Sequence, residues 1–275
     1  MADQLLEDQV QHRLDNGVAW ITLNRPEAHN AITPEQRDRV IALLARADAD
    51  LGTRVVVLTA TGKGFCTGAD LRSGSGRDPA LPDGAPERPV GSVARLIEQG
   101  AQRLIAALLD CSKPVIAAVN GTAAGIGAHM ALACDLVVAA QGAKFIEVFV
   151  RRGIVPDGGG AYLLPRLVGL HRAKELVYFG DDLMAEQALG LGLVNKVVPP
   201  DQLLDAAAQW ADRLAQGPTL ALGQAKRLLN DSLDSDRTGA FRQEANAQEM
   251  IMSSFDANEG IAAFVERRPP RFRGY

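Results

Sequence analysis

The sequence predicts an α/β fold followed by a region built of helices alone. Short β-branched runs alternate with longer segments of helical period as far as about residue 200. From Asp201 onward only helical patterns remain, with Leu220, Ala221, Gln224 and Leu228 among the clearest. The 275 residues are 47% hydrophobic and 23% charged, which supplies a sizeable core and excludes a disordered chain.

The N-terminal elements can be assigned from local patterns. Residues 10–23 predict a hairpin, because Asp15-Asn16-Gly17 tolerates positive φ between two runs of strand formers, so we expect the chain to open with β structure. Thr33-Pro34-Glu35-Gln36 predicts a helix start, with an N-cap, a first-turn proline and a capping-box partner. Residues 55–59 predict a strand that is buried on both faces.

A break in the pattern follows at residues 72–91, which hold four Gly and four Pro. We expect a mobile surface excursion there, with an interdomain linker as the alternative. The elements expected after it are a helix over 93–109, a strand over 115–119, a helix over 125–134 and a strand over 136–140.

The helical region is divided by Pro218 and by the acidic segments 231–236 and 256–259, which we interpret as breaks between helices. The final helix is expected to carry Ile261, Phe264 and Val265 on one face.

Charge and cysteine content narrow the classes of partner. The chain has 29 Lys and Arg against 33 Asp and Glu, a net charge of -4, without a basic run to follow a phosphate backbone. Cys66, Cys111 and Cys134 lie far apart, which favours reduced thiols and offers no zinc framework. The acidic start lacks the features of a signal peptide, and no window approaches the roughly 18 apolar residues of a membrane span. We therefore expect a cytoplasmic protein that binds neither nucleic acid nor a membrane.

Two glycine-rich turns each follow a predicted buried strand: TGKGFCTGAD over 61–70 and NGTAAGIG over 120–127. Glycine lets backbone N–H groups point outward from a turn, so each turn has donors for an anionic oxygen. A tight connection without function is the alternative for either turn taken singly.

The second turn also resembles the phosphate loop of short-chain dehydrogenases, which suggests a nicotinamide enzyme as a competing class. That loop opens the chain in those enzymes, whereas here it begins at residue 121. Their Tyr-x-x-x-Lys is missing too, since Tyr162 and Tyr178 are followed four residues later by Arg166 and Asp182.

Taken together, the motifs resemble those of the crotonase superfamily, which contains the enoyl-CoA hydratases and isomerases. They are Asn24-Arg25-Pro26 with Asn30-Ala31, FCTGADL over 65–71, KPVIAAVNG over 113–121, Cys134-Asp135, LGLGLV over 189–194 and AFVERRPPRF over 263–272. The resemblance covers nearly the whole chain. It implies a crotonase-like spiral of ββα units over residues 1–200. Over 201–275 it implies a helical oligomerisation region that builds a homotrimer, or a hexamer of two stacked trimers.

The resemblance also implies an enzyme that acts on acyl-CoA thioesters. The backbone N–H groups of Ala69 and Ile126 match the pair that forms an oxyanion hole around the thioester carbonyl. Preplaced amides of this kind stabilise the charge that a thioester enolate places on its oxygen. The residues that match the coenzyme A site are Arg25, Ala28, Thr67, Asp70 and Leu71, with Phe264 and Arg267 supplied by a neighbouring subunit. Coenzyme A enters as part of the substrate, and no metal, nicotinamide or flavin is implied.

The chain departs from the hydratase pattern at both catalytic positions. Typical hydratases use two glutamates, one to activate water and one to protonate the α carbon. Here His129 stands at the first position and Phe149 at the second. His129 is interpreted either as a packed histidine or as a substrate contact. Glu147 lies two residues before Phe149, on the same face if that stretch is extended, and is a weaker candidate for the base.

Asp157 is the remaining candidate for the acid and base. The segment 149–169 resembles the 1,2-epoxyphenylacetyl-CoA isomerase branch, in which an aspartate at this position has that role, and enoyl-CoA isomerases can place a carboxylate there too. One carboxylate suffices to move a proton from the α carbon of a β,γ-unsaturated thioester to the γ carbon. The structural alternative is that Asp157 caps a helix over 158–167, and the two roles are compatible.

Three main functions remain open from the sequence, and dehalogenation and thioester hydrolysis stay open beside them, because the superfamily carries different reactions on one oxyanion hole. The first is double-bond or epoxide isomerisation through an enolate, with Asp157 as acid and base. The second is hydration of a 2-enoyl-CoA by Asp157 with His129. The third is a catalytically weak homologue that binds acyl-CoA and assembles. Cys66 is expected to pack, because no histidine neighbour is evident to activate it.

Overall fold

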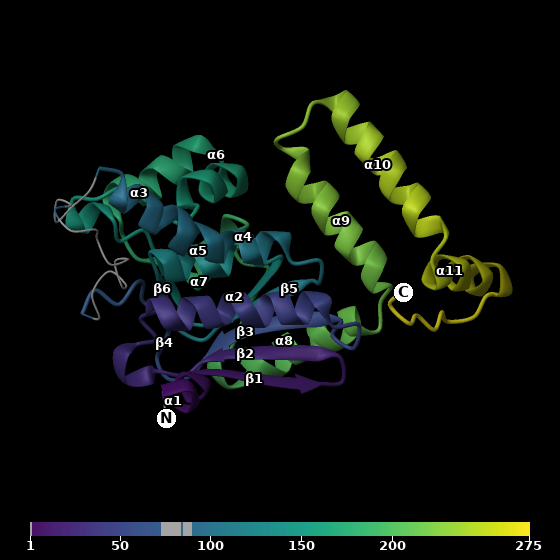
Figure 1. Ribbon diagram of the computed structural model, residues 1–275, viewed down its shortest axis with the longest axis horizontal. Helices are drawn as coiled ribbons and strands as arrows, with labels where there is room; N and C mark the ends of the chain where they lie inside the picture. The colour runs from purple at the N-terminus through teal and green to yellow at the C-terminus, as the bar shows by residue number, and fades with distance from the viewer. Residues whose placement is uncertain (1, 73–83, 85–89) are drawn as a thin grey trace.

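The computed structural model describes residues 2–72, 84 and 90–275, so the segment predicted as a surface excursion lies almost entirely outside the described residues. In the described part of the chain, the strands form two sheets, which confirms the predicted α/β organisation. The larger sheet has the order β1-β2-β3-β5-β7-β10 and is parallel except for the β1–β2 hairpin (Figure 1). Its strands are β1 (Val10–Asp15), β2 (Val18–Leu23), β3 (Val55–Ala60), β5 (Val115–Val119), β7 (Leu136–Ala140) and β10 (Lys196–Val198).

The smaller sheet has the order β4-β6-β8-β9, in which β4, β6 and β8 are parallel. Its strands are β4 (Gly64–Cys66), β6 (Thr122–Ala124), β8 (Lys144–Ile146) and β9 (Leu183–Met184). Along the chain, β3, β5 and β7 of the larger sheet are each followed by a strand of the smaller sheet and then by a helix. This repetition is the ββα unit that the resemblance implied.

Helices cover both faces of the larger sheet. The faces alternate along β3: Val56 and Leu58 pack in the cluster that contains α2 and α4, while Val55 and Val57 pack in the cluster that contains α8. These helices are α2 (Pro34–Ala49), α4 (Arg103–Asp110) and α8 (Leu203–Ala215). A sheet buried in this way holds its strand ends, and the turns that leave them, in fixed positions.

Most local predictions agree with the structure. The capping box is present, since Gln36 N–H donates to Thr33 Oγ1 at 3.3 Å and Thr33 N–H donates to Gln36 Oε1 at 3.0 Å. The helix expected over 93–109 is formed by α3 (Ser92–Ile97), a π-helical turn and α4. The expectation that the chain opens with a strand is wrong, because α1 (Ala2–Gln9), rich in good helix formers, precedes β1.

The remaining helices before α8 are α5 (Ile126–Leu132), α6 (Gly160–Phe179) and α7 (Ala185–Gly190). Short 3-10 turns occupy Pro26–Ala28, Val150–Arg152 and Pro200–Gln202. α6 contains a non-helical residue at Gly169, with φ 75° and ψ 161°, so its axis is kinked there. None of the helices described is long and apolar enough to cross a membrane.

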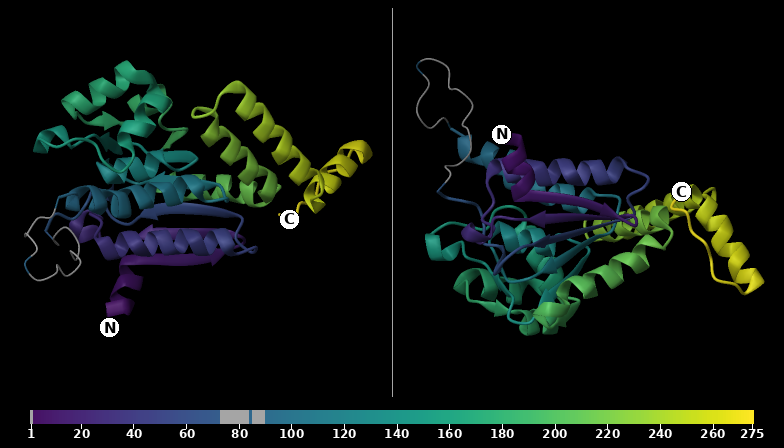
Figure 2. Two further views of the ribbon diagram at one scale, coloured as in Figure 1. Left: turned by 45° about the horizontal axis from the view of Figure 1, so that its top comes forward. Right: turned by 90° about the horizontal axis from the view of Figure 1, so that it is seen from below.

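The last three helices are α9 (Thr219–Ser232), α10 (Arg237–Met252) and α11 (Phe255–Glu266). Of these, α9 packs on the α/β body, where Lys226 Nζ lies 3.0 Å from Asp135 Oδ2, whereas α10 and α11 extend away from the body (Figures 1 and 2). The breaks predicted at Pro218 and over 231–236 coincide with helix boundaries. The division at residue 201 stays a prediction, and α8, which lies beyond it, packs against β3, β5 and β7.

The break predicted at residues 256–259 is wrong, because these residues lie inside α11. Ser254 caps this helix by accepting the Ala257 N–H at 3.1 Å. Asp256 then falls in the first helical turn, where an acidic residue is stabilised by the helix dipole. The acidic residues therefore mark the beginning of a helix instead of a gap between two.

Candidate active site

The first glycine turn leaves the end of β4 and passes beside the segment that precedes α2. Ile32 N–H donates to the Gly68 carbonyl at 2.8 Å and Asp70 N–H donates to the Ile32 carbonyl at 3.0 Å, which bridges Ile32 with Ala69. Successive amides of an extended segment point in opposite directions, so Ala69 N–H points away from Ile32. Among the described residues, this N–H has no acceptor.

The second glycine turn leaves β6, the neighbour of β4 in the smaller sheet. Gly125 has φ 54° and ψ -125°, a conformation that glycine adopts readily and other residues avoid, and α5 begins at the next residue, Ile126. The first N–H of a helix has no acceptor inside the helix. Within the described ranges no other acceptor binds the Ile126 N–H, so a second amide is available.

The two turns touch through their backbones. A Cβ built on Gly121 would lie 2.0 Å from the Lys63 carbonyl oxygen, and one on Gly127 would lie 2.0 Å from the Cys66 carbonyl oxygen. Because β4 and β6 are parallel neighbours, their carboxyl ends reach the same edge of the smaller sheet. The structure thus brings the Ala69 and Ile126 amides to one edge, as an oxyanion hole requires.

Asp157 stands on the loop that leads into α6, close to the second turn. A Cβ on Gly158 would lie 2.4 Å from Ile126 Cδ1, and one on Gly160 would lie 2.2 Å from His129 Nε2. The glycines after Asp157 therefore pack directly on α5. Burial raises the pKa of the Asp157 carboxyl, while His129 opposes this rise and Glu147 adds a smaller one. A partly buried carboxyl with a raised pKa beside the turn that presents the Ile126 amide is a candidate for proton exchange.

The alternative role of Asp157, as a helix cap, is wrong. α6 begins at Gly160, and its N-cap is Gly159, which has φ 84° and makes no side-chain cap hydrogen bond. Asp157 contributes only its backbone carbonyl, which accepts the Gly160 N–H at 3.3 Å. A glycine supplies the positive φ of the cap position, and the carboxylate is not used for capping.

His129 and Glu147 form a buried pair that the sequence analysis did not predict. His129 Nε2 lies 3.1 Å from Glu147 Oε2, and the two side chains are 0% and 5% exposed. The Phe149 ring stacks on the His129 ring, with a centroid distance of 5.3 Å and an interplanar angle of 13°. Glu147 and Phe149 thus meet the same partner, although the stretch is not extended: β8 ends at Ile146, and Phe149 has helical backbone angles. His129 Nδ1 is buried, without a hydrogen-bond partner among the described residues.

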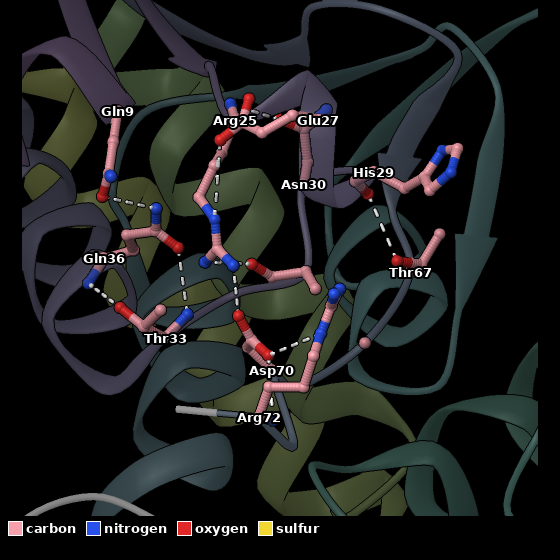
Figure 3. A network of polar contacts seen from close by, with 12 residues as sticks. Gln9, Arg25, Glu27, His29, Asn30, Thr33, Gln36, Thr67, Asp70 and Arg72 are labelled. Carbon is pink, nitrogen blue, oxygen red and sulfur yellow. Dashed lines mark hydrogen bonds and ion pairs between the residues drawn. The ribbon is translucent and has the colours of Figure 1, made fainter. Parts of the chain in front are cut away.

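Five predicted coenzyme A contacts lie around the first turn. Arg25 and Asp70 form an ion pair with each other (Figure 3). Thr67 is half-buried, Ala28 is buried and Leu71 is exposed. The side chains of Arg25 and Asp70 are therefore engaged inside the protein, whereas Leu71 is open to a ligand.

The other two predicted contacts, Phe264 and Arg267, lie on α11 and at its C-cap. α11 is at the opposite end of the molecule from β4 (Figure 1). One chain alone does not bring these two residues to the turns.

The cysteines have the predicted character. Cys66, Cys111 and Cys134 are free and buried. Burial raises the pKa of the Cys66 thiol to about 11, so that it is protonated at neutral pH and packs beside the first turn.

Known proteins are similar to this chain in sequence and fold over almost their whole length. Residues 13–275 match the family model described as Enoyl-CoA hydratase/isomerase. The chain is 38% identical to the 1,2-epoxyphenylacetyl-CoA isomerase of Escherichia coli K12 over 95% of this chain and 97% of that protein. It is 35% identical to the 2,3-dehydroadipyl-CoA hydratase of the same strain over 94% and 95%.

Among solved structures, an enoyl-CoA hydratase/isomerase from Cupriavidus metallidurans CH34 superimposes with a TM-score of 0.86 at 37% identity. The match covers 98% of this chain and 97% of that chain. Such matches confirm the predicted crotonase-like fold, including the C-terminal helices. An isomerase and a hydratase are matched almost equally well, so they share the family and differ in reaction. The chain belongs to the enoyl-CoA hydratase/isomerase family and is an enzyme that acts on CoA thioesters.

Proposed function

We propose that this enzyme isomerises an enoyl-CoA by way of a thioester enolate, with Asp157 as acid and base. The observation that carries the proposal is the position of one partly buried carboxylate, Asp157, beside the turn that presents the Ile126 amide. The two titratable groups that influence it, His129 and Glu147, are buried and bound to each other. A site with one available carboxylate suits a reaction in which a single proton moves between two carbons.

The reaction begins with a β,γ-unsaturated thioester whose carbonyl oxygen accepts from the Ala69 and Ile126 amides. The Asp157 carboxylate removes a proton from the α carbon, and the electron pair of that C–H bond moves toward the carbonyl to give an enolate. Each amide stabilises the charge on the oxygen by about 3 kcal/mol. Asp157, now protonated, returns the proton to the γ carbon, and the double bond moves between the α and β carbons. The raised pKa makes its carboxylate a stronger base for the first step.

The remaining features of the site are proposed on the same basis. Leu71, Thr67 and the backbone of the first turn would contact coenzyme A, and Phe264 and Arg267 would reach it from a neighbouring subunit of a trimer or hexamer. Support for assembly comes from the exposed apolar side chains on α11, which include Phe264 and Val265. Amides and a carboxylate suffice for enolate chemistry, so we propose a reaction without a metal, nicotinamide or flavin, in the cytoplasm.

Hydration is the second candidate, and the His129–Glu147 pair is the observation that favours it. Water addition needs a second acid–base group besides Asp157, and this pair could supply one. The burial of both side chains and the Phe149 ring over His129 restrict access of water to the pair. Isomerisation, which needs no activated water, is therefore the better supported reaction.

Turnover of a 3-enoyl-CoA by the Asp157→Asn variant tests the proposal. We expect kcat to fall by at least about 100-fold with little change in KM, because the amide keeps the shape of the side chain and cannot carry the proton. The matched control is Asp182→Asn, which removes an exposed carboxylate that pairs with Lys144 and Arg151 away from the site. Turnover by Asp157→Asn at the wild-type rate would contradict the assignment.

A substrate panel separates the alternatives. Fast addition of water to crotonyl-CoA by the wild-type enzyme, abolished by His129→Ala, would establish hydration instead. Tight binding without conversion of any enoyl or epoxy thioester would identify a catalytically weak acyl-CoA-binding homologue.

A further inference from the structure

The ion pair between Arg25 and Asp70 lies beside the turn that carries the Ala69 amide (Figure 3). Asp70 directly follows Ala69, whereas Arg25 lies 45 residues earlier, after β2. The side chains are only 16% and 5% exposed. A buried ion pair needs further polar contacts to offset the loss of hydration, and its neighbourhood provides them.

The Arg25 guanidinium connects both sides of the bridge between Ile32 and Ala69. Its Nη1 donates to the Ala31 carbonyl at 3.1 Å, and its Nη2 donates to Asp70 Oδ2. One contact thus holds Ala31, the residue before Ile32, and the other holds Asp70, the residue after Ala69. The planar guanidinium is rigid, so the two contacts fix the distance between these segments.

Asn30 anchors the backbone of Arg25. Asn30 Oδ1 accepts the Arg25 N–H at 2.7 Å, and Asn30 Nδ2 donates to the carbonyls of Thr61 and Gly64 at 2.8 Å each. Thr61 and Gly64 flank the turn into β4. The arginine is therefore tied to the beginning of β4, the strand that leads into the turn with Ala69.

Asp70 is held from its other side too, because its Oδ1 accepts the Arg72 N–H at 3.0 Å. The hydrogen bond from Arg25 holds the pKa of Asp70 below its usual range, so this carboxylate is ionised at neutral pH. Asp70 N–H donates to the Ile32 carbonyl, and the Gly68 carbonyl, which shares a peptide with the Ala69 N–H, accepts from Ile32 N–H, so the contacts restrict rotation of the peptides on both sides of Ala69.

We propose that Arg25 and Asp70 are positioning residues for the Ala69 amide and do not bind coenzyme A through their charges. They hold the first turn so that the Ala69 N–H is aimed at the thioester oxygen before charge develops on it, which avoids reorganisation during the reaction. This inference rests on the proposed function, since it requires an enolate at that position. The Arg25 charge is already offset by Asp70 and by Glu27, whose Oε1 lies 3.9 Å from Nε.

Two probes that share the coenzyme A part test the inference. 3-Oxobutanoyl-CoA ionises readily to an enolate, whereas butanoyl-CoA is saturated and keeps a neutral carbonyl. For Arg25→Gln and Asp70→Asn we expect binding of 3-oxobutanoyl-CoA to weaken by about 10-fold and that of butanoyl-CoA to change by less than about 2-fold. Turnover of a 3-enoyl-CoA should lose about 10-fold in kcat with little change in KM.

The control is Arg72→Gln, because Arg72 is a second cation near this carboxylate within the described residues, at 3.8 Å, and its side chain is 81% exposed. This variant keeps the backbone N–H that binds Asp70 and should bind both probes as the wild type does. The double variant Arg25→Gln with Asp70→Asn should lose no more than either single variant, because the two side chains act as a unit.

Equal weakening of both probes would show that the charges contact coenzyme A, and unchanged binding of both would show no positioning role. Either result overturns the inference. Arg25→Lys, which keeps the charge, provides a milder variant if Arg25→Gln does not fold, and we expect the same selective loss at smaller size. The enolate probe does not depend on which reaction is catalysed, so a wild type that fails to isomerise would remove the proposed function and leave this test intact.

Discussion

The two turns that present the Ala69 and Ile126 amides are held by different kinds of contact. The first turn is fixed by polar side chains from other segments, namely Asn30 and Arg25. The second is fixed by backbone packing, with Gly127 against the Cys66 carbonyl and α5 beginning at Ile126. Substitutions that remove charge or hydrogen bonds should therefore disturb the first turn, and substitutions that add side-chain volume should disturb the second.

The aspartates beside the two turns also differ in their contacts and in the direction of their pKa shifts. Asp70, after the first turn, is paired with Arg25, and this contact lowers its pKa. Asp157, beside the second turn, makes no ion pair within the described residues, and burial raises its pKa. The paired carboxylate is suited to holding structure, whereas the other is suited to exchanging a proton.

The largest effect is expected from Gly127→Ala. The new Cβ would lie 2.0 Å from the Cys66 carbonyl oxygen, a backbone atom that cannot rotate away, so the two turns must separate. We expect a loss of about 2–4 kcal/mol in the free energy of unfolding and of at least about 100-fold in kcat. Urea unfolding and steady-state kinetics measure the two losses.

Gly190→Ala is the control for Gly127→Ala, since a Cβ at this helical glycine would meet no atom within 4 Å. It should leave both activity and stability at the wild-type level or slightly above it. If Gly127→Ala resembled this control, the second turn would not depend on close packing.

A smaller effect is expected from Asn30→Ala in the support of the first turn. Asn30 is 2% exposed, and its removal leaves the Thr61 and Gly64 carbonyls and the Arg25 N–H with one partner fewer. We expect a loss of about 2–3 kcal/mol in the free energy of unfolding, together with a lower kcat. Chemical denaturation and initial rates would measure both.

Asn30 also has a positive φ of 55°, so part of its loss would be backbone strain. Asn16→Ala controls for this contribution, because Asn16 has φ 49° and is exposed in the β1–β2 turn. An Asn30→Ala loss no greater than that of Asn16→Ala would mean that the buried hydrogen bonds do not support the turn.

The features that could be predicted from the sequence are those set by residues close together in the chain. The capping box at Thr33 and the β1–β2 turn at Asn16-Gly17 are local, and both were predicted with their contacts or positions. The break predicted at 256–259 is wrong because Ser254 caps a helix there, and acidic residues are favoured in a first helical turn as well as in a loop. The family resemblance pointed to Ala69 and Ile126, and the structure places both at one sheet edge.

Pairs between distant segments were beyond sequence reasoning. His129 and Glu147 are 18 residues apart and Arg25 and Asp70 are 45 apart, so no periodicity connects them. Their pairing depends on how the ββα units stack, which is a property of tertiary packing. The family resemblance predicts Arg25 and Asp70 as ligand contacts, and the structure engages their side chains with each other.

The smallest effect, and the most direct comparison of the two aspartates, is the pH dependence of stability in Asp70→Asn and Asp157→Asn. The lowered pKa of Asp70 means that its ionised form stabilises the fold at neutral pH, and that this contribution is lost as the pH falls through the lowered value. Asp70→Asn should therefore melt below the wild type at pH 7, with a gap that narrows in acid.

Asp157 should give the opposite sign. Its raised pKa favours the protonated form in the folded state, so its stabilising contribution is present at low pH and is lost as the pH rises through the raised value. Asp157→Asn should melt above the wild type at pH 7 by about 1–3 °C, with a difference that disappears in acid, although it has lost activity. Thermal melts at several pH values measure both variants. Shifts of the same sign in the two variants would mean that the two carboxylates share one role. Only the removal of a carboxylate that destabilises the fold, as one kept for chemistry does, should make the protein more stable.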